Sequence, residues 1–175
     1  AIYYPTYDLC YSVGYKIITE ILEAAKIRYK PNLKFSYIVI PGCGRIYLRS
    51  LDNPARIVGY ESTDSGLDEL DTLPQKKATE VWAKIVGRNR QKKAGDMPNT
   101  ISVATTPEGF GFCYSKWGRD AKPGYERFKA STGSNQRNLA PGYVQTLRSE
   151  YSSAALIAYE NGDFVNLKEG SVYPE

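Results

Sequence analysis

Residues 63–74 read TDSGLDELDTLP, and they decide how the rest of the chain is interpreted. With the residues just upstream, the stretch places five carboxylates close together: Glu61, Asp64, Asp68, Glu69 and Asp71. One interpretation is a solvated acidic loop or the first turn of a helix, where acidic side chains are favoured. The other is a divalent-metal site, because Mg²⁺ binds carboxylate oxygens and keeps several waters. The local pattern by itself favours the solvated surface, so the remaining sequence has to decide.

The composition restricts the chemistry that is open to the chain. Its 175 residues, 42% of them hydrophobic, are enough for one domain with a real core. The absence of histidine excludes Ser-His-Asp and Cys-His catalysis and His-ligated zinc. Cys10, Cys43 and Cys113 form no CxxC pair, which favours a reduced, intracellular setting over a zinc knuckle or a disulfide framework. No apolar run approaches the roughly 20 residues that span a bilayer, so no membrane contact is expected.

Apolar spacing and turn residues predict alternating strands and helices. The expected strands cover residues 1–4, 35–40, 45–49, 100–104 and 125–130, with a hairpin at PGCG. The expected helices cover residues 6–26, 75–90, 142–151 and 153–160, and a shorter helical stretch is expected at 111–117. The first helix has Thr6 as its N-cap and an apolar stripe of Ile17, Ile18, Ile21, Leu22 and Ala25. Strands separated by helices indicate an α/β fold with a mostly parallel sheet flanked by helices.

Three loops are expected at the carboxyl ends of strands, where ligands bind in open α/β sheets. They are PTYD at 5–8, DELD at 68–71 and TTPEG at 105–109. Together they offer a helix N-terminus, two carboxylates and two hydroxyls, which a phosphate and Mg²⁺ site needs. In such a site one carboxylate orients the ion and its neighbour positions the attacking water, which makes Asp68 and Glu69 the candidates. The preceding stretch ESTDSGL is half polar and makes a poor buried strand.

Two hydroxyls and two arginines are further candidates, each with a structural alternative. Thr105 and Thr106 are suited to sensing a γ-phosphate, but they also fit an ordinary turn before a proline. Arg49 and Arg56 flank the turn before the acidic stretch. Either is placed to stabilise transition-state charge, or to be a surface arginine.

Four basic residues form RNRQKK at the end of the helix expected at 75–90: Arg88, Arg90, Lys92 and Lys93. Cations at that end suit the helix dipole, and they are equally candidates for contacts with DNA phosphates. The net charge of +4 permits a polyanionic partner without requiring one.

Five blocks in sequence order carry a resemblance to a known family: PTYD, SLDNPARIVGYESTDSGLDELDTLP, KATEVWAKIVGRNRQ, NTISVATTPEGFGFCY and YENGDFVNLKEGSVY. Over nearly its whole length the chain resembles the ATPase half of the large terminase subunit of tailed bacteriophages. The resemblance implies a P-loop NTPase core of the ASCE, RecA/helicase-like kind. Such a core uses ATP and Mg²⁺ to drive double-stranded DNA into a procapsid.

Residue roles also follow from the resemblance. It implies that Asp68 is the Walker B aspartate on Mg²⁺ and that Glu69 is the catalytic glutamate. Residues 104–106 match the coupling motif that links hydrolysis to movement. Residues 5–6 are similar to the helicase-like motif after the second core strand.

The sequence departs from the family in two places. No GxxxxGK[ST] occurs in it, so the loop that cradles the phosphates is missing. Val58 stands where many relatives have an arginine, which leaves Arg56 as the arginine-finger candidate. We therefore expect residues 1–162 to form a partial ATPase (motor) domain without the P-loop strand, and 163–175 to be a linker towards an absent nuclease domain. We expect this fragment to be an inactive or poorly stable part of a longer ATP hydrolase.

The implied partners are double-stranded DNA, a portal protein and the small terminase subunit. The resemblance implies a ring homo-oligomer during packaging, a monomer in isolation, and a place in the host cell cytoplasm. A second hypothesis is a non-catalytic nucleotide-fold module that binds DNA or a partner protein, because the phosphate loop is missing and RNRQKK is basic. A third is a metal-dependent nuclease, which is the least favoured because two-metal sites generally gather carboxylates from separate strands.

Overall fold

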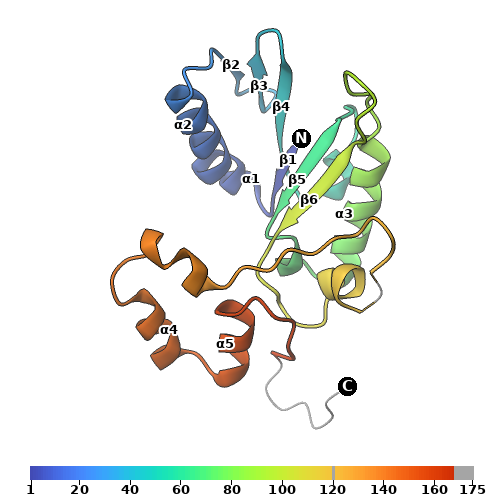
Figure 1. The fold of residues 1–175 in the computed structure, drawn as a ribbon. Coiled ribbons are helices and arrows are strands. Elements are labelled where there is room, and N and C mark those ends of the chain that lie inside the picture. The colour runs from blue at the N-terminus through green and yellow to red at the C-terminus, as the bar shows by residue number, and fades with distance from the viewer. Residues whose placement is uncertain (120, 168–175) are drawn as a thin grey trace. The chain divides into compact units, whose positions relative to one another are not determined.

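The computed structural model describes residues 1–119 and 121–167 (Figure 1). The chain divides into two compact units, Ala1–Ala104 and Thr105–Glu175. The predicted boundary at 162/163 stays a prediction. Residues 168–175 of the predicted linker lie outside the described part of the chain.

The first unit contains a six-stranded sheet with the strand order β2-β3-β4-β1-β5-β6 (Figure 1). The strands are β1 (Ile2–Tyr4), β2 (Lys30–Asn32), β3 (Tyr37–Ile40), β4 (Gly44–Ser50), β5 (Asp64–Asp68) and β6 (Thr100–Ala104). The four strands β4, β1, β5 and β6 run parallel to one another, while β2 and β3 extend the sheet in antiparallel fashion. The prediction of an α/β fold with a mostly parallel sheet is confirmed, and β2 is a strand that the sequence did not reveal.

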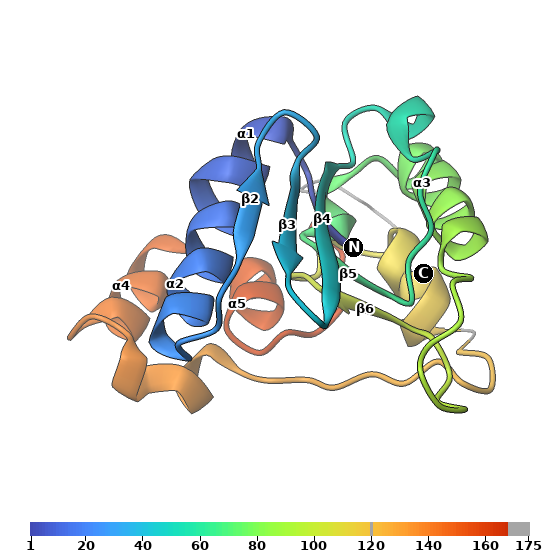
Figure 2. The same cartoon turned by 90° about the horizontal axis from the view of Figure 1, so that it is seen from above.

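The two faces of the sheet are covered by different helices, as Figure 2 shows. Tyr4, Ile38 and Leu48 point to one face and form a buried cluster with Cys10, Ile18 and Leu22 from the first helical region. On the other face, α3 (Gln75–Arg88) buries its apolar side, which consists of Ala78, Val81, Trp82 and Ile85. Each helix therefore covers only part of the sheet, which leaves β2–β4 open on the face that α2 does not cover.

The polar stretch before the DELD loop does form a strand. In β5 the residues alternate between buried and half-exposed, and Ser65 and Leu67 are the buried ones. Ser65 Oγ donates a hydrogen bond to Asn89 Oδ1 at the end of α3, 3.0 Å away, which satisfies the buried hydroxyl. Period-two burial with a bonded serine explains why a half-polar sequence is stable at this place in the sheet.

The first helical region begins where the sequence predicts and is less regular than predicted. It consists of α1 (Tyr7–Leu9), a π-helical turn (Cys10–Tyr15) and α2 (Lys16–Ala24). Thr6 caps it, since its side chain accepts a hydrogen bond from the Leu9 N–H. Of the predicted apolar stripe only Ile18 and Leu22 are buried, while the other three members, Ile17, Ile21 and Ala25, are exposed.

The π-helical turn packs closely on the Tyr4 ring of β1. A Cβ atom on Gly14 would lie 2.6 Å from the Cζ atom of the Tyr4 ring, closer than side-chain carbons approach in proteins. Glycine therefore lets the helix backbone lie directly on the Tyr4 ring. The extra residue of a π-helical turn commonly marks a functional site in a helix.

The second unit contains α4 (Tyr143–Glu150) and α5 (Ser153–Tyr159), both close to the predicted helices. It also contains a π-helical turn (Tyr114–Gly118) that overlaps the predicted stretch 111–117 and a 3-10 helix (Thr132–Asn138). The predicted strand at 125–130 is wrong, because those residues have no regular structure. Side chains hold the segment instead: Arg127 stacks on Phe164, and Lys129 Nζ lies 2.8 Å from Asp163 Oδ1.

Within the described residues, no helix is long and apolar enough to cross a membrane.

Candidate functional site at the carboxyl end of the sheet

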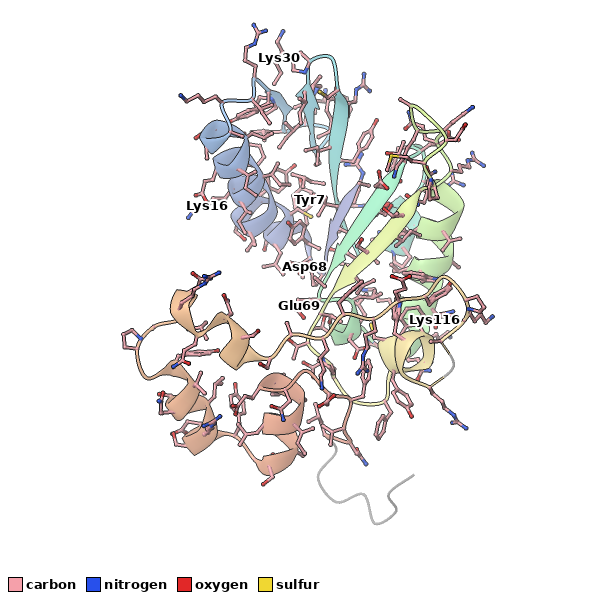
Figure 3. All side chains as sticks on the ribbon, in the orientation of Figure 1. Tyr7, Lys16, Lys30, Asp68, Glu69 and Lys116 are labelled. Carbon is pink, nitrogen blue, oxygen red and sulfur yellow. The ribbon has the colours of Figure 1, made fainter. Side chains whose placement is uncertain are left out.

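Parallel strands place their carboxyl ends at one edge of a sheet, and here three loops with polar side chains begin at that edge. Pro5 and Thr6 follow β1, Asp52 follows β4, and Asp68 ends β5 with Glu69 directly after it. Figure 3 labels Asp68 and Glu69 at this edge, with Tyr7 from α1 on the same side. The sequence predicted this convergence for PTYD and DELD, and the strand topology confirms that both loops lie at the carboxyl edge.

Asp68 is the last residue of β5 and is half-buried. It is in register with Ala104 on β6. It also lies close to Tyr4, whose phenol has a raised pKa because it is buried and, to a lesser degree, because the charge of Asp68 is near. The buried side chain of Tyr4 is thus near the Asp68 carboxylate.

Glu69 has an unusual backbone. Its φ and ψ are 49° and 43°, in the left-handed region that non-glycine residues seldom occupy. Its N–H donates a 2.7 Å hydrogen bond to the carbonyl of Ala104, and its carbonyl accepts one from Thr72 Oγ1 at 2.6 Å. These bonds hold the strained turn and connect the end of β5 to the end of β6. Residues held in strained conformations cluster at functional sites, so the backbone supports the choice of Glu69.

Cys10 and Asp52 complete this edge of the sheet, and the sequence singled out neither of them for the site. Ser50 Oγ donates a 2.6 Å hydrogen bond to Asp52 Oδ1, which fixes the carboxylate after β4. Burial, and then the charge of Asp52, raises the pKa of the Cys10 thiol to about 11. Cys10 is therefore a neutral core residue rather than a reactive thiolate. The block DNP contained the signal for Asp52, but nothing in it distinguishes a site carboxylate from a turn former.

Asp71 is buried in the 3-10 helix Leu70–Thr72 that follows Glu69. The other two acidic residues of the opening stretch lie at the opposite end of β5. Glu61 and Asp64 precede or begin β5, at the amino end of the sheet. Arg90 Nη2 lies 2.7 Å from Glu61 Oε1, and Lys93 Nζ lies 2.7 Å from Asp64 Oδ1. Burial would raise the pKa of Asp64, but Lys93 and two hydrogen bonds from Thr100 outweigh it and lower the pKa to about 2. The five carboxylates thus form two separate groups, of which the one at the amino end is neutralised by cations.

The donor set at the carboxyl edge fits a magnesium ion that is shared with a substrate. In the described part of the chain, no three Asp, Glu or Cys side chains are close enough to hold a metal ion by themselves. Mg²⁺ in phosphate-transfer sites uses one or two carboxylates, with waters and phosphate oxygens as the other ligands. Asp68, half-buried at a strand end, is suited to be that carboxylate. A metal-dependent nuclease would require a larger carboxylate cluster, so this arrangement does not support the nuclease hypothesis.

The other candidates are distributed over both units. Arg56 is exposed in a 3-10 turn (Pro54–Arg56). Arg49 is used structurally, since its Nη1 donates to the carbonyls of Phe35, Ser36 and Leu48 at 3.2, 2.9 and 2.8 Å. Thr105 and Thr106 are half-buried at the start of the second unit, directly after β6 in the chain.

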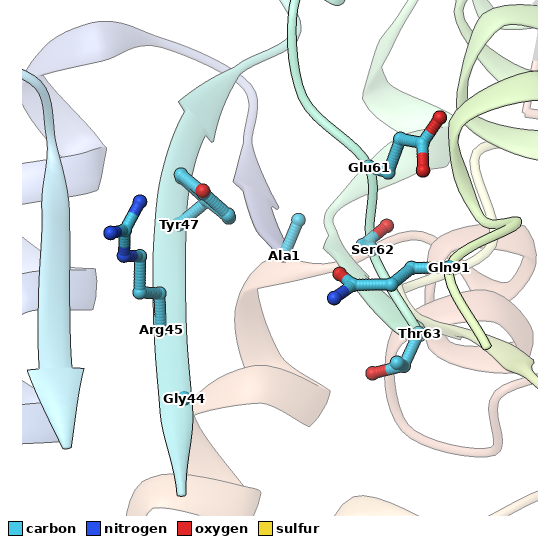
Figure 4. A pocket seen from close by; sticks show the side chains of 8 residues that line it. All are labelled: Ala1, Gly44, Arg45, Tyr47, Glu61, Ser62, Thr63 and Gln91. Carbon is cyan, nitrogen blue, oxygen red and sulfur yellow. The ribbon is translucent and has the colours of Figure 1, made fainter. Parts of the chain in front are cut away.

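A cavity of about 290 Å³ opens at the opposite, amino end of the sheet (Figure 4). Its walls include Arg45 and Tyr47 on β4 and Glu61 and Gln91 across from them. Ligands of open α/β sheets bind beyond the carboxyl ends of strands. We therefore assign the candidate site to the carboxyl edge and not to this cavity.

Comparisons with known proteins identify the family and the fold of the chain. Residues 11–175 match the family model described as terminase large subunit, T4likevirus-type, N-terminal. A comparison with curated protein sequences finds no match.

Solved structures of large terminases share the fold. The Thermus phage P74-26 large terminase ATPase domain superposes with a TM-score of 0.62 at 16% identity, over 94% of this chain and 75% of that one. The large terminase of a thermophilic bacteriophage, in complex with ADP, gives a TM-score of 0.69 at 13% identity over 94% of this chain. The chain spans only 40% of that structure.

The family match extends from the first helical region to the last residue, and the fold is the mixed α/β fold of large terminase ATPase domains. The chain therefore belongs to the T4likevirus-type terminase large subunit family, as its N-terminal part, and so to a family of DNA-packaging motors.

Proposed function

We propose that the chain is the part of an ATP-driven DNA-packaging motor that carries the magnesium-binding aspartate and the water-activating glutamate. The observation that supports this most is the adjacent pair Asp68 and Glu69 at the carboxyl end of β5, with Glu69 in the left-handed conformation. A carboxylate at a strand end lies at the edge of the sheet where α/β proteins bind ligands. The left-handed residue after it turns the chain sharply, so the second carboxylate follows a different direction.

In this proposal each carboxylate has one task. Asp68 accepts hydrogen bonds from the water shell of a magnesium ion that is bound with the nucleotide, or ligates the ion directly. The ion supplies charge stabilisation to the phosphates. Glu69 holds the attacking water and accepts its proton.

The bond between Glu69 N–H and the Ala104 carbonyl suggests how hydrolysis is coupled to movement. The residue that positions the water is tied to the strand that runs directly into Thr105 and Thr106. We propose that these two hydroxyls respond to the γ-phosphate. A change in the Glu69 turn would then shift the end of β6 and the chain that follows it.

The remaining components belong to the whole motor. The arginine finger is proposed to be Arg56, acting from an exposed turn on a neighbouring subunit of a ring. Double-stranded DNA, the portal protein and the small terminase subunit are the proposed partners, and the host cell cytoplasm is the proposed location. Because GxxxxGK[ST] does not occur in these 175 residues, we propose that this chain alone does not hydrolyse ATP.

The test measures ATP hydrolysis by two proteins: this chain, and this chain preceded by a segment that contains GxxxxGK[ST]. We expect turnover in the second protein only, and we expect Glu69→Gln to lower it at least about a hundredfold while ATP still binds. Glu80→Gln, an equivalent change on the exposed side of α3, is the matched control and should have little effect. Turnover that survives Glu69→Gln would remove Glu69 from the mechanism. Failure of both proteins to hydrolyse ATP, with DNA present, would favour the non-catalytic binding module.

A further inference from the structure

The positive charge of the chain is concentrated in one segment. Of its 23 basic residues, six lie between residues 24 and 51: Lys26, Arg28, Lys30, Lys34, Arg45 and Arg49. None of the 19 acidic residues lies there. The other 17 basic and 19 acidic residues nearly balance, so this segment accounts for the net charge of +4.

The fold arranges this segment as the antiparallel part of the sheet. Lys30 on β2 and Arg45 on β4 are both in register with Val39 on β3. Residues opposite each other on neighbouring strands share a face of the sheet. Lys30 and Arg45 therefore lie on one face, two strand spacings or about 10 Å apart at their backbones. Tyr37 and Tyr47 form the next row on the same face.

This face, which we call the basic face (Lys30, Tyr37, Arg45 and Tyr47), is the one that α2 does not cover. The opposite face of the same strands buries Ile38 and Leu48 in the cluster with α2. Figure 3 labels Lys30 at the outer end of the sheet, away from Asp68 and Glu69. Lys30 and Arg45 are exposed, and both tyrosines are half-buried.

Arg45 is positioned by stacking rather than by an acidic partner. Its guanidinium lies 5.2 Å from the centre of the Tyr37 ring, and the Tyr37 and Tyr47 rings pack edge to face at 5.9 Å. The Arg45 guanidinium also donates a hydrogen bond to the Tyr47 side chain, and its remaining N–H groups can contact a phosphate. Arg49 differs, because its Nη1 donates hydrogen bonds to three backbone carbonyls. This side chain therefore stabilises the sheet.

The other basic region, RNRQKK, has two of its four basic residues neutralised. Arg90 and Lys93 are paired with Glu61 and Asp64 at 2.7 Å each. No basic residue of the segment 24–51 takes part in an ion pair among the described residues. A cation that is not already paired gains more from contact with a phosphate, because no existing ion pair has to be broken.

We propose that the basic face binds the phosphate backbone of duplex DNA, with Lys30 and Arg45 as its two main contacts and Tyr37 as the platform of Arg45. This proposal deepens the proposed function, and rests on it for the choice of DNA as the polyanion. Backbone contact carries no sequence preference, which suits a protein that must move along any sequence.

The test compares three double variants that all lower the net charge by four. Lys30→Glu/Arg45→Glu alters the basic face, Arg88→Glu/Lys92→Glu alters the helix-end run, and Lys76→Glu/Lys122→Glu is the control. Binding of the 175-residue chain to a 30-base-pair duplex of mixed sequence is measured by fluorescence anisotropy between about 50 and 200 mM salt. We expect the basic-face variant to lose at least about tenfold in affinity and its log–log salt slope to fall by about two. The control should lose less than about threefold.

Circular dichroism checks that each variant is folded. If Lys30→Glu/Arg45→Glu is unfolded, Lys30→Gln/Arg45→Gln is measured in its place. The proposal is overturned if the basic-face variant binds as the control does, if the helix-end variant loses more, or if the unaltered chain does not bind at the lowest salt. Because the assay contains no ATP, its outcome is independent of the Glu69→Gln test. If Glu69→Gln abolishes hydrolysis but the basic-face variant binds DNA as the control does, the basic-face proposal fails. If Glu69→Gln leaves hydrolysis intact but the basic-face variant loses affinity, the role of Glu69 fails.

Discussion

The two ends of β5 carry the same kind of side chain and differ in what surrounds it. At the amino end, Asp64 accepts hydrogen bonds from Thr100 and pairs with Lys93, and its pKa falls to about 2. At the carboxyl end, Asp68 lies beside the neutral Tyr4 ring, and the next residue, Glu69, has a strained backbone. One end of the strand is stabilised by neutralisation, while the other keeps conformational strain.

This difference shows why a cluster of carboxylates in a sequence is not yet a site. A strand of five residues separates its two ends by about 13 Å, because each residue rises by about 3.3 Å. Carboxylates that are neighbours in the sequence therefore belong to opposite edges of the sheet. Of the two edges, the carboxyl edge is where α/β proteins bind ligands.

The largest effect is expected from exchanging each aspartate for its amide. In the protein preceded by a GxxxxGK[ST] segment, Asp68→Asn should lower ATP hydrolysis about a hundredfold or more, because the ion loses a charged ligand. Asp64→Asn, the same change at the other end of the strand, should keep hydrolysis within about twofold of the unaltered rate, because the ion pair with Lys93 and the hydrogen bonds from Thr100 lie at the amino end of the sheet. Steady-state assays at saturating Mg²⁺ and ATP measure both. Equal losses would mean that the two ends do not differ in function.

A substitution at Gly14 should loosen the carboxyl end through Tyr4. Gly14→Ala places a methyl group against the Tyr4 ring and should reduce the free energy of unfolding by about 1–3 kcal/mol, the usual range for overpacking. Gly87→Ala on α3 is the control, since nothing lies within 4 Å of its added Cβ. It should raise stability by about 0.5–1 kcal/mol, as replacing a helical glycine does. Urea unfolding followed by circular dichroism compares the two, and a stable Gly14→Ala protein would contradict the close packing.

The strained turn at Glu69 predicts a reversed order of glycine and alanine. In the left-handed region glycine is favoured, so Glu69→Gly should be more stable than Glu69→Ala by about 1 kcal/mol. At Glu80, in the middle of α3, alanine should be more stable than glycine by about the same amount. Thermal unfolding of the four variants measures this. The same order at both positions would show that Glu69 is not strained.

The smallest effect concerns acid. A carboxyl group with a lowered pKa stabilises the fold above its unfolded pKa of about 4, and this stabilisation is lost as the pH falls towards its folded pKa of about 2. Because the Asp64 side chain is 48% exposed, solvent reduces the effect to about 0.5–1 kcal/mol. Asp64→Asn should therefore be less stable than the unaltered chain at pH 6, and the difference should shrink between pH 4 and 3. If the difference in stability between the two proteins does not change with pH, the charge of Asp64 does not stabilise this end of the strand.

The sequence was a good guide where local chemistry decides. Thr6 is a helix cap as predicted, the α3 face of Ala78, Val81, Trp82 and Ile85 is buried, and PTYD and DELD lie at one edge of the sheet. Caps and helix faces depend on residues within a few positions of one another.

It was a poor guide where partners are distant in sequence. The strand predicted at 125–130 is absent, and Arg127 and Lys129 of this segment contact Phe164 and Asp163 through their side chains. In RNRQKK, Arg90 and Lys93 are neutralised by Glu61 and Asp64, which lie about thirty residues earlier in the chain. The assignments of Asp68, Glu69 and Arg56 to catalysis stay predictions until they are tested by mutation.

The sequence alone determined the class of chemistry: no histidine, a pair of adjacent carboxylates and ordered blocks that resemble a terminase ATPase. Those properties belong to residue types and their order, which need no fold to be recognised. Only the tertiary structure decided which carboxylates are neutralised, that Glu69 is strained, and that Lys30 and Arg45 share an open face. Such properties depend on the register between strands, and register is set by packing between residues that are far apart in the chain.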